Sequence, residues 1–105
     1  MKTLVNYLNE SLNNNLKKEI EERAWGIIDY FNQEGVQGFD ENDWKAYIDG
    51  SKEPDYKQIV DEIVAEYGDD PKGKKAVAFL NNYDKNKEEI IEIILNAANS
   101  YLNNN

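Results

Sequence analysis

Apolar residues recur three and four positions apart along most of this chain, the spacing that places side chains on one face of an α-helix. Such stripes run through residues 16–34, 40–49, 54–67, 74–83 and 87–102, and a shorter one through 2–12. No segment alternates apolar and polar residues as a half-buried strand does. The pattern therefore predicts an all-α protein: a compact bundle of five to six short helices forming one domain over 1–105, with a frayed tail at 103–105.

Residues that begin or end helices stand at the edges of these stripes. Gly35 and Gly68 each follow a stripe directly, as glycine does at a helix C-terminus. Asp40 is predicted to cap the helix that follows it, with Asp43 three residues further on. Pro54 is expected in the first turn of the next helix, where its missing N–H does no harm.

Three further expectations concern the connections and one interior glycine. Gly26 falls within the stripe of 16–34, where close packing against another helix would explain a glycine. Residues 69–73 are predicted to form a connecting loop. Residues 84–86 are predicted to interrupt helical structure before the last helix and to cap the start of that helix.

Composition excludes several classes of chemistry. The 105 residues contain no cysteine and no histidine. Disulfides and thiolate metal sites are therefore excluded, and the commonest general base is missing. The longest apolar run is residues 76–80, far short of the ~20 residues that a transmembrane helix needs. We expect a protein without a membrane segment, located in the cytoplasm.

Charge is concentrated in the middle of the chain. Residues 40–70, the acidic block, hold eleven acidic and three basic residues, a net charge of −8 against −9 for the whole chain. Nucleic acid and anionic membranes carry the same sign, so direct binding to either is disfavoured. A basic protein partner is favoured instead.

No motif identifies an activity or a cofactor. Residues 68–75 have the spacing of a phosphate-binding P-loop, but Lys75 stands where the magnesium-binding hydroxyl belongs. The sequence around Gly50 and the sequence from Asp84 both lack the ligand pattern of an EF-hand calcium loop. We therefore predict a protein that is not an enzyme, with no metal site and no cofactor.

Two interpretations of the acidic block stay open. It is either a solvated face that keeps the protein soluble, or a surface that enters the basic groove of a partner as a nucleic acid would. Trp44 fits either the core or an anchor at the rim of such a surface. The candidate partner-binding residues are Asp40, Glu41, Asp43, Trp44, Asp49, Asp55, Asp61, Glu62, Glu66, Asp69 and Asp70.

The first eleven residues, MKTLVNYLNES, carry a resemblance to a known family. They resemble the capsid-targeting leaders of T-even-type phage proteins, which begin Met-Lys-Thr, carry an aromatic near position 7 and end in an aliphatic-x-Glu cleavage site. Leu8-Asn9-Glu10 matches that last element, whereas Val5 and Asn6 depart from the usual pattern. An amphipathic first helix fits the same residues. The resemblance implies a phage or mobile-element origin, where small acidic proteins often inhibit host defence or transcription as nucleic-acid mimics.

The function expected from these observations is a non-enzymatic acidic binding protein, encoded by a phage, that engages a basic nucleic-acid-handling protein of the host and inhibits it. The alternative is a packaged or structural phage protein, delivered into the particle by its N-terminal peptide. A homo-oligomer is compatible with either.

Overall fold

The computed structural model describes residues 14–103, which fold into α-helices and one 3₁₀ turn, with no strand in that range. The elements are α2 (Asn14–Glu34), α3 (Glu41–Asp49), α4 (Tyr56–Tyr67), η1 (Pro71–Gly73), α5 (Lys74–Asn81) and α6 (Tyr83–Asn103). The prediction of an all-α bundle with five to six helices is confirmed. The helix expected over 2–12, the leader-like residues 1–11 and most of the frayed tail lie outside the described residues.

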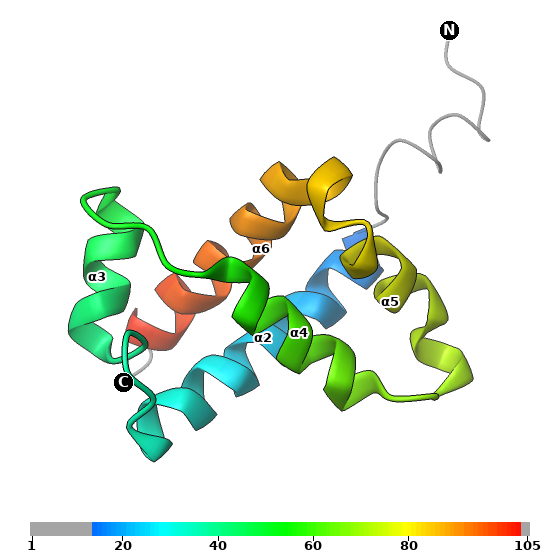
Figure 1. Ribbon diagram of the computed structural model, residues 1–105, viewed down its shortest axis with the longest axis horizontal. Helices are drawn as coiled ribbons and strands as arrows, with labels where there is room; N and C mark the ends of the chain where they lie inside the picture. Colours follow the sequence, from blue (N-terminus) through cyan, green and yellow to red (C-terminus); the bar gives the residue numbers. More distant parts are fainter. Residues whose placement is uncertain (1–13, 104–105) are drawn as a thin grey trace, which may run out of the picture.

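The two longest helices of the described fold are α2 and α6, each of 21 residues. They lie side by side and run in the same general direction, and α4 crosses them (Figure 1). α3 covers one end of this group, against α6, and α5 covers the other, against α4 and α6. The molecule measures 44 × 31 × 25 Å along its principal axes.

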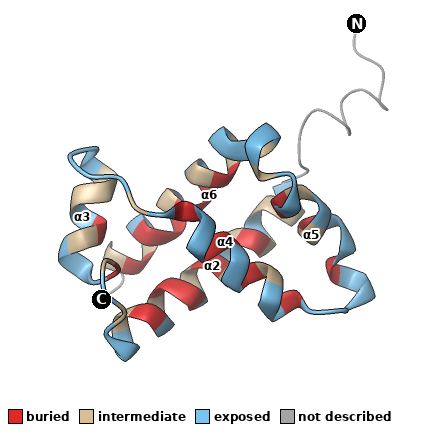
Figure 2. Ribbon diagram, viewed as in Figure 1, coloured by how far each residue is buried: buried red, intermediate tan, exposed pale blue. Residues whose placement is uncertain are grey.

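The core lies where the apolar stripes of these helices meet. Figure 2 shows buried residues on the inward faces of α2, α4 and α6 and exposed residues on their outer faces. Among the described residues, no polar or charged residue is buried. The largest fully buried side chains are Trp44, Ile20, Ile28, Ile59, Ile63, Leu80, Ile90, Ile94 and Val60.

Several helix ends follow the predictions. Asp40 caps α3 in a reciprocal capping box with Asp43, in which each side chain accepts the other residue's backbone N–H, at 2.8 and 3.2 Å. Gly68 ends α4, where its N–H donates to the carbonyl of Val64 at 3.1 Å. Gly35 follows α2 with a φ of 68°, a left-handed conformation that glycine adopts without strain.

Other boundaries were predicted wrongly. Pro54 lies two residues before α4, which begins at Tyr56, so it is not in the first turn. The break before α6 is at Asn82 alone, since α6 already begins at Tyr83 and includes residues 84–86. The side chain of Asn86 donates to the carbonyl of Phe79 at 2.9 Å and so closes the end of α5. The connection predicted at 69–73 does lie between α4 and α5, and its residues 71–73 form a 3₁₀ turn.

Gly26 is the other correction. It is exposed, and a Cβ placed on it would meet no atom within 4 Å. No neighbouring helix approaches it among the described residues, so close packing does not explain this glycine.

Candidate partner-binding surface

The acidic block follows the long axis of the molecule. It begins at the cap of α3, continues through the α3–α4 connection and along α4, and ends in the turn before η1 (Figure 1, green segment). Nine of its ten candidate carboxylate residues are exposed, and Asp43 is half-buried. The structure therefore brings the predicted acids onto accessible surface without gathering them into one pocket.

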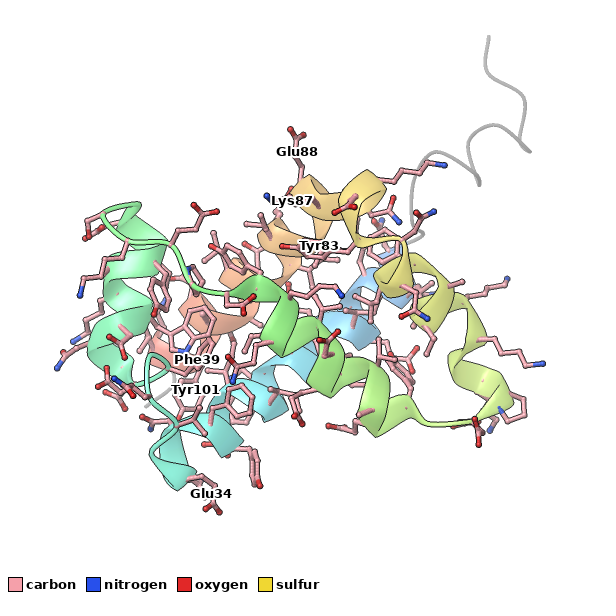
Figure 3. The ribbon with its side chains drawn as sticks, in the orientation of Figure 1. Glu34, Phe39, Tyr83, Lys87, Glu88 and Tyr101 are labelled. Atoms are coloured by element: carbon pink, nitrogen blue, oxygen red, sulfur yellow. The ribbon has the colours of Figure 1, made fainter. Side chains whose placement is uncertain are left out.

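Trp44 does not belong to this surface. Its side chain is fully buried, at 0% exposure, and its ring lies 5.9 Å from that of Phe39 and 5.3 Å from that of Tyr47. Of the two interpretations for this residue, the structure supports core packing, and its assignment to the partner-binding set was wrong. Figure 3 shows Phe39 directed into the same interior.

Four of the ten acids stabilise local backbone structure. Besides the capping box of Asp40 and Asp43, Asp49 accepts the N–H of Ser51 at 2.8 Å, and Asp70 accepts that of Lys72 at 3.0 Å. Hydrogen bonds from Ser51 lower the pKa of the Asp49 carboxyl, because they favour its ionised form. The presence of these four acids is explained by their hydrogen bonds at the ends of helices and turns, whether or not they also contact a partner.

Two more acids pair with basic side chains. Asp61 lies 3.5 Å from Nζ of Lys57, one turn earlier on α4. Glu66 accepts a hydrogen bond of 3.1 Å from Nη1 of Arg23 on α2. Both pairs are solvent-exposed, so each stabilises the fold by only about 0–1 kcal/mol, but both reduce the net charge that a partner would meet.

Four candidates remain without such a role: Glu41, Asp55, Glu62 and Asp69. None of them makes a hydrogen bond or ion pair with any residue in the range 14–103, and all four are exposed. They are distributed from α3 to the turn after α4. Their charge has no counterpart inside the described part of the chain, so they are the strongest candidates for contact with a basic partner.

The acidic surface also includes residues that the sequence did not single out. Burial raises the pKa of Tyr83, and the nearby charges of Asp55, Glu53 and Asp84 raise it further. Burial, followed by the charge of Glu53, likewise raises the pKa of Tyr56. Carboxylates of the α3–α4 connection and of the start of α6 therefore act on the same tyrosine, which extends the acidic surface to Asp84.

Sequence reasoning missed Asp84 because it is 29 positions from Asp55 and belongs to a segment that is close to neutral overall. Its position after Tyr83 in the sequence does not indicate that it lies near the acidic block. Only the packing of α6 against α3 and α4 brings it to the acidic block.

A metal centre and a membrane-spanning segment are both absent from the described residues. Within 14–103, no group of three or more aspartate or glutamate residues is arranged to hold a metal ion. Over the same range, no helix is long and apolar enough to cross a bilayer.

Comparison with known proteins gives no match to a family model, to a curated protein or to a solved structure. The class that the fold and the surface define is that of a small all-α protein with an acidic face.

Proposed function

We propose that this chain is a non-enzymatic binding protein whose acidic surface engages a basic, nucleic-acid-handling protein and blocks its nucleic-acid groove. One observation carries the proposal: Glu41, Asp55, Glu62 and Asp69 are exposed along the acidic block without a hydrogen-bond or ion-pair partner in residues 14–103. Carboxylates that neither cap a helix nor pair with a base add repulsion within the chain. A partner of opposite charge gives them a function and steers association.

The experiment is a pull-down from bacterial lysate with the tagged protein, at low and at high salt. Recovery of a DNA- or RNA-binding protein, lost as salt rises, is the expected result, because salt screens contacts between exposed charges. The partner should then lose nucleic-acid binding when the acidic protein is added. Recovery that salt does not change would contradict an electrostatic interface.

A charge-matched pair of variants makes the test specific. Glu41→Gln/Asp55→Asn/Glu62→Gln removes three charges from the acidic surface. Glu34→Gln/Glu88→Gln/Glu92→Gln removes three from exposed positions outside it. Figure 3 shows Glu34 and Glu88 directed into solvent at opposite edges of the molecule. Only the first variant should lose the partner, and equal loss in both would show that net charge alone matters.

The packaged-protein alternative rests on residues 1–11, which lie outside the described residues. Intact-mass measurement on protein recovered from phage particles tests it. A mature form that begins at Ser11 supports the alternative, and absence from particles rejects it.

A further inference from the structure

A small hollow opens between α2 and α6. Its volume is about 190 Å³, and it is lined by Glu21, Glu22, Trp25, Ala97 and Ser100. Trp25 and Ala97 give it apolar walls, the two glutamates give it negative charge, and none of its lining residues within 14–103 is basic. Sites for drug-sized ligands measure roughly 300–1,000 Å³, so this hollow is suited to one side chain and not to a cofactor.

The hollow is separate from the acidic surface. Residues two apart on an α-helix project about 200° apart, so Arg23 and Trp25 lie on different flanks of α2. Arg23 reaches Glu66 of α4, whereas Trp25 meets Tyr101 of α6. A ligand in the hollow therefore contacts α2 and α6 without displacing anything on α4.

The aromatic wall of the hollow is held in place from behind. The rings of Trp25 and Tyr101 meet edge to face, with 5.2 Å between centroids and 71° between planes. The Tyr101 hydroxyl donates to Asp29 at 3.0 Å and accepts from the side-chain amide of Asn32 at 3.1 Å. Gln33 donates to the same Asp29 carboxylate at 3.0 Å. Since these contacts fix Tyr101, they also position the indole ring before any ligand arrives.

The two glutamates have no such restraint. Neither Glu21 nor Glu22 makes a hydrogen bond or ion pair with its side chain in the range 14–103. They precede Trp25 by four and three residues, the two spacings that place side chains on adjoining positions of one helix face. Two free carboxylates therefore border one positioned aromatic ring.

We infer that the hollow binds an arginine side chain of a partner protein or peptide, as a site beyond the acidic surface described above. A guanidinium group stacks on an indole face and keeps its N–H donors at the edge of its plane, where carboxylates accept them. An aromatic wall bordered by two carboxylates complements both properties. A lysine ammonium would gain the charge attraction but neither the stacking nor the paired hydrogen bonds.

The test is a titration of the ¹⁵N-labelled protein with N-acetyl-arginine amide, followed by NMR. The indole N–H of Trp25 should shift saturably, with a Kd of about 1–10 mM, the range for a ligand of this size. Trp44 supplies an internal control, because its fully buried indole should not shift. The citrulline analogue, which has the same shape without the charge, should leave Trp25 unchanged, and the lysine analogue should bind several-fold more weakly.

Variants decide whether the hollow is the site. The Glu21→Gln/Glu22→Gln variant should lose the saturable shift of the Trp25 indole N–H. The rest of its NMR spectrum should remain that of the folded protein. The acidic-surface variant Glu41→Gln/Asp55→Asn/Glu62→Gln should bind the arginine probe as the unchanged chain does. The inference is overturned if the Trp25 indole shows no saturable shift, if the lysine analogue binds equally well, or if the Glu21→Gln/Glu22→Gln variant keeps its affinity.

Discussion

The guanidinium carbon of Arg23 lies 4.0 Å from the centre of the Tyr67 ring, so the only arginine in the chain stacks on a buried tyrosine of α4. The same guanidinium donates to Glu66, the neighbour of Tyr67 on α4, at 3.1 Å. Tyr67 also packs against Gly73, the last residue of η1 before α5. One tyrosine thus connects α2, α4 and the η1–α5 junction.

Replacing Arg23 should weaken this connection measurably. We expect Arg23→Ala to lower the free energy of unfolding by about 1 kcal/mol, from lost stacking and lost coverage of the ring. The melting temperature should fall by about 4–8 °C. Glu66→Gln should cost less than about 0.5 kcal/mol, because the ion pair is exposed. Thermal and urea unfolding of both variants measure this, and equal losses would show that the ion pair, not the stacking, stabilises the contact.

Replacing Gly26, the exposed glycine of α2, with alanine should stabilise the protein. Gly26→Ala adds a methyl group that meets no atom within 4 Å and removes backbone freedom from the unfolded chain. We expect it to stabilise the protein by about 0.5–1 kcal/mol, seen as a higher urea midpoint with an unchanged slope. A destabilised variant would mean that another surface covers Gly26 in solution.

The buried glycine before α5 should behave in the opposite way. A Cβ on Gly73 would lie 2.5 Å from Cδ1 of Tyr67 and 3.1 Å from its Cγ. These ring atoms cannot move independently, and Arg23 stacks on the same ring. Gly73→Ala should therefore destabilise the fold by about 1–3 kcal/mol. The contrast with Gly26→Ala, the same substitution measured in the same way, separates a steric requirement from helix propensity.

The local part of this fold could be predicted from the sequence. In α4 the stripe of Ile59, Val60, Ile63 and Tyr67 is buried as its spacing predicts. The cap at Asp40 follows equally directly, because capping depends on residues within one turn. The break before α6 was predicted at the wrong place because residues 84–86 are polar, whereas the structure needs only Asn82 to leave helical geometry.

The candidate site was harder to predict because it depends on contacts distant in sequence. Glu66 is neutralised by Arg23, 43 positions away, and Asp84 joins the acidic surface only through packing of α6. The sequence alone left two interpretations of Trp44 because tryptophan occurs both in cores and at interfaces. Its burial depends on Phe39 and Tyr47 closing over a helix of only nine residues.

Substitutions at Asp40 separate its structural role from its contribution to the acidic surface. Asp40→Ala removes the side chain that accepts the N–H of Asp43, and should destabilise α3 by about 1 kcal/mol. Asp40→Asn keeps an equally good cap but removes the charge, so it should unfold at nearly the same urea concentration. If the asparagine variant is as unstable as the alanine variant, the charge at the helix N-terminus, and not the hydrogen bond, is what stabilises α3.

Stability should fall at alkaline pH. Burial is the main cause that raises the pKa of four tyrosines, Tyr47, Tyr56, Tyr67 and Tyr83, above 10.0 in the folded protein. Below pH 10 both folded and unfolded chains hold these protons, so the stabilising contribution is complete. Above it the unfolded chain loses protons that the folded chain keeps, and the free energy of unfolding declines until the folded pKa values are passed.

Urea unfolding at intervals from pH 8 to 11 measures this decline, and Tyr56→Phe tests its origin. The substitution removes one of the four tyrosine hydroxyls whose pKa is raised and should make the decline above pH 10 shallower. Tyr30→Phe is the matched control, because the Tyr30 ring is 55% exposed and lies outside the core. An identical decline in the Tyr56→Phe variant and the unchanged chain would show that the Tyr56 hydroxyl does not contribute to the alkaline sensitivity.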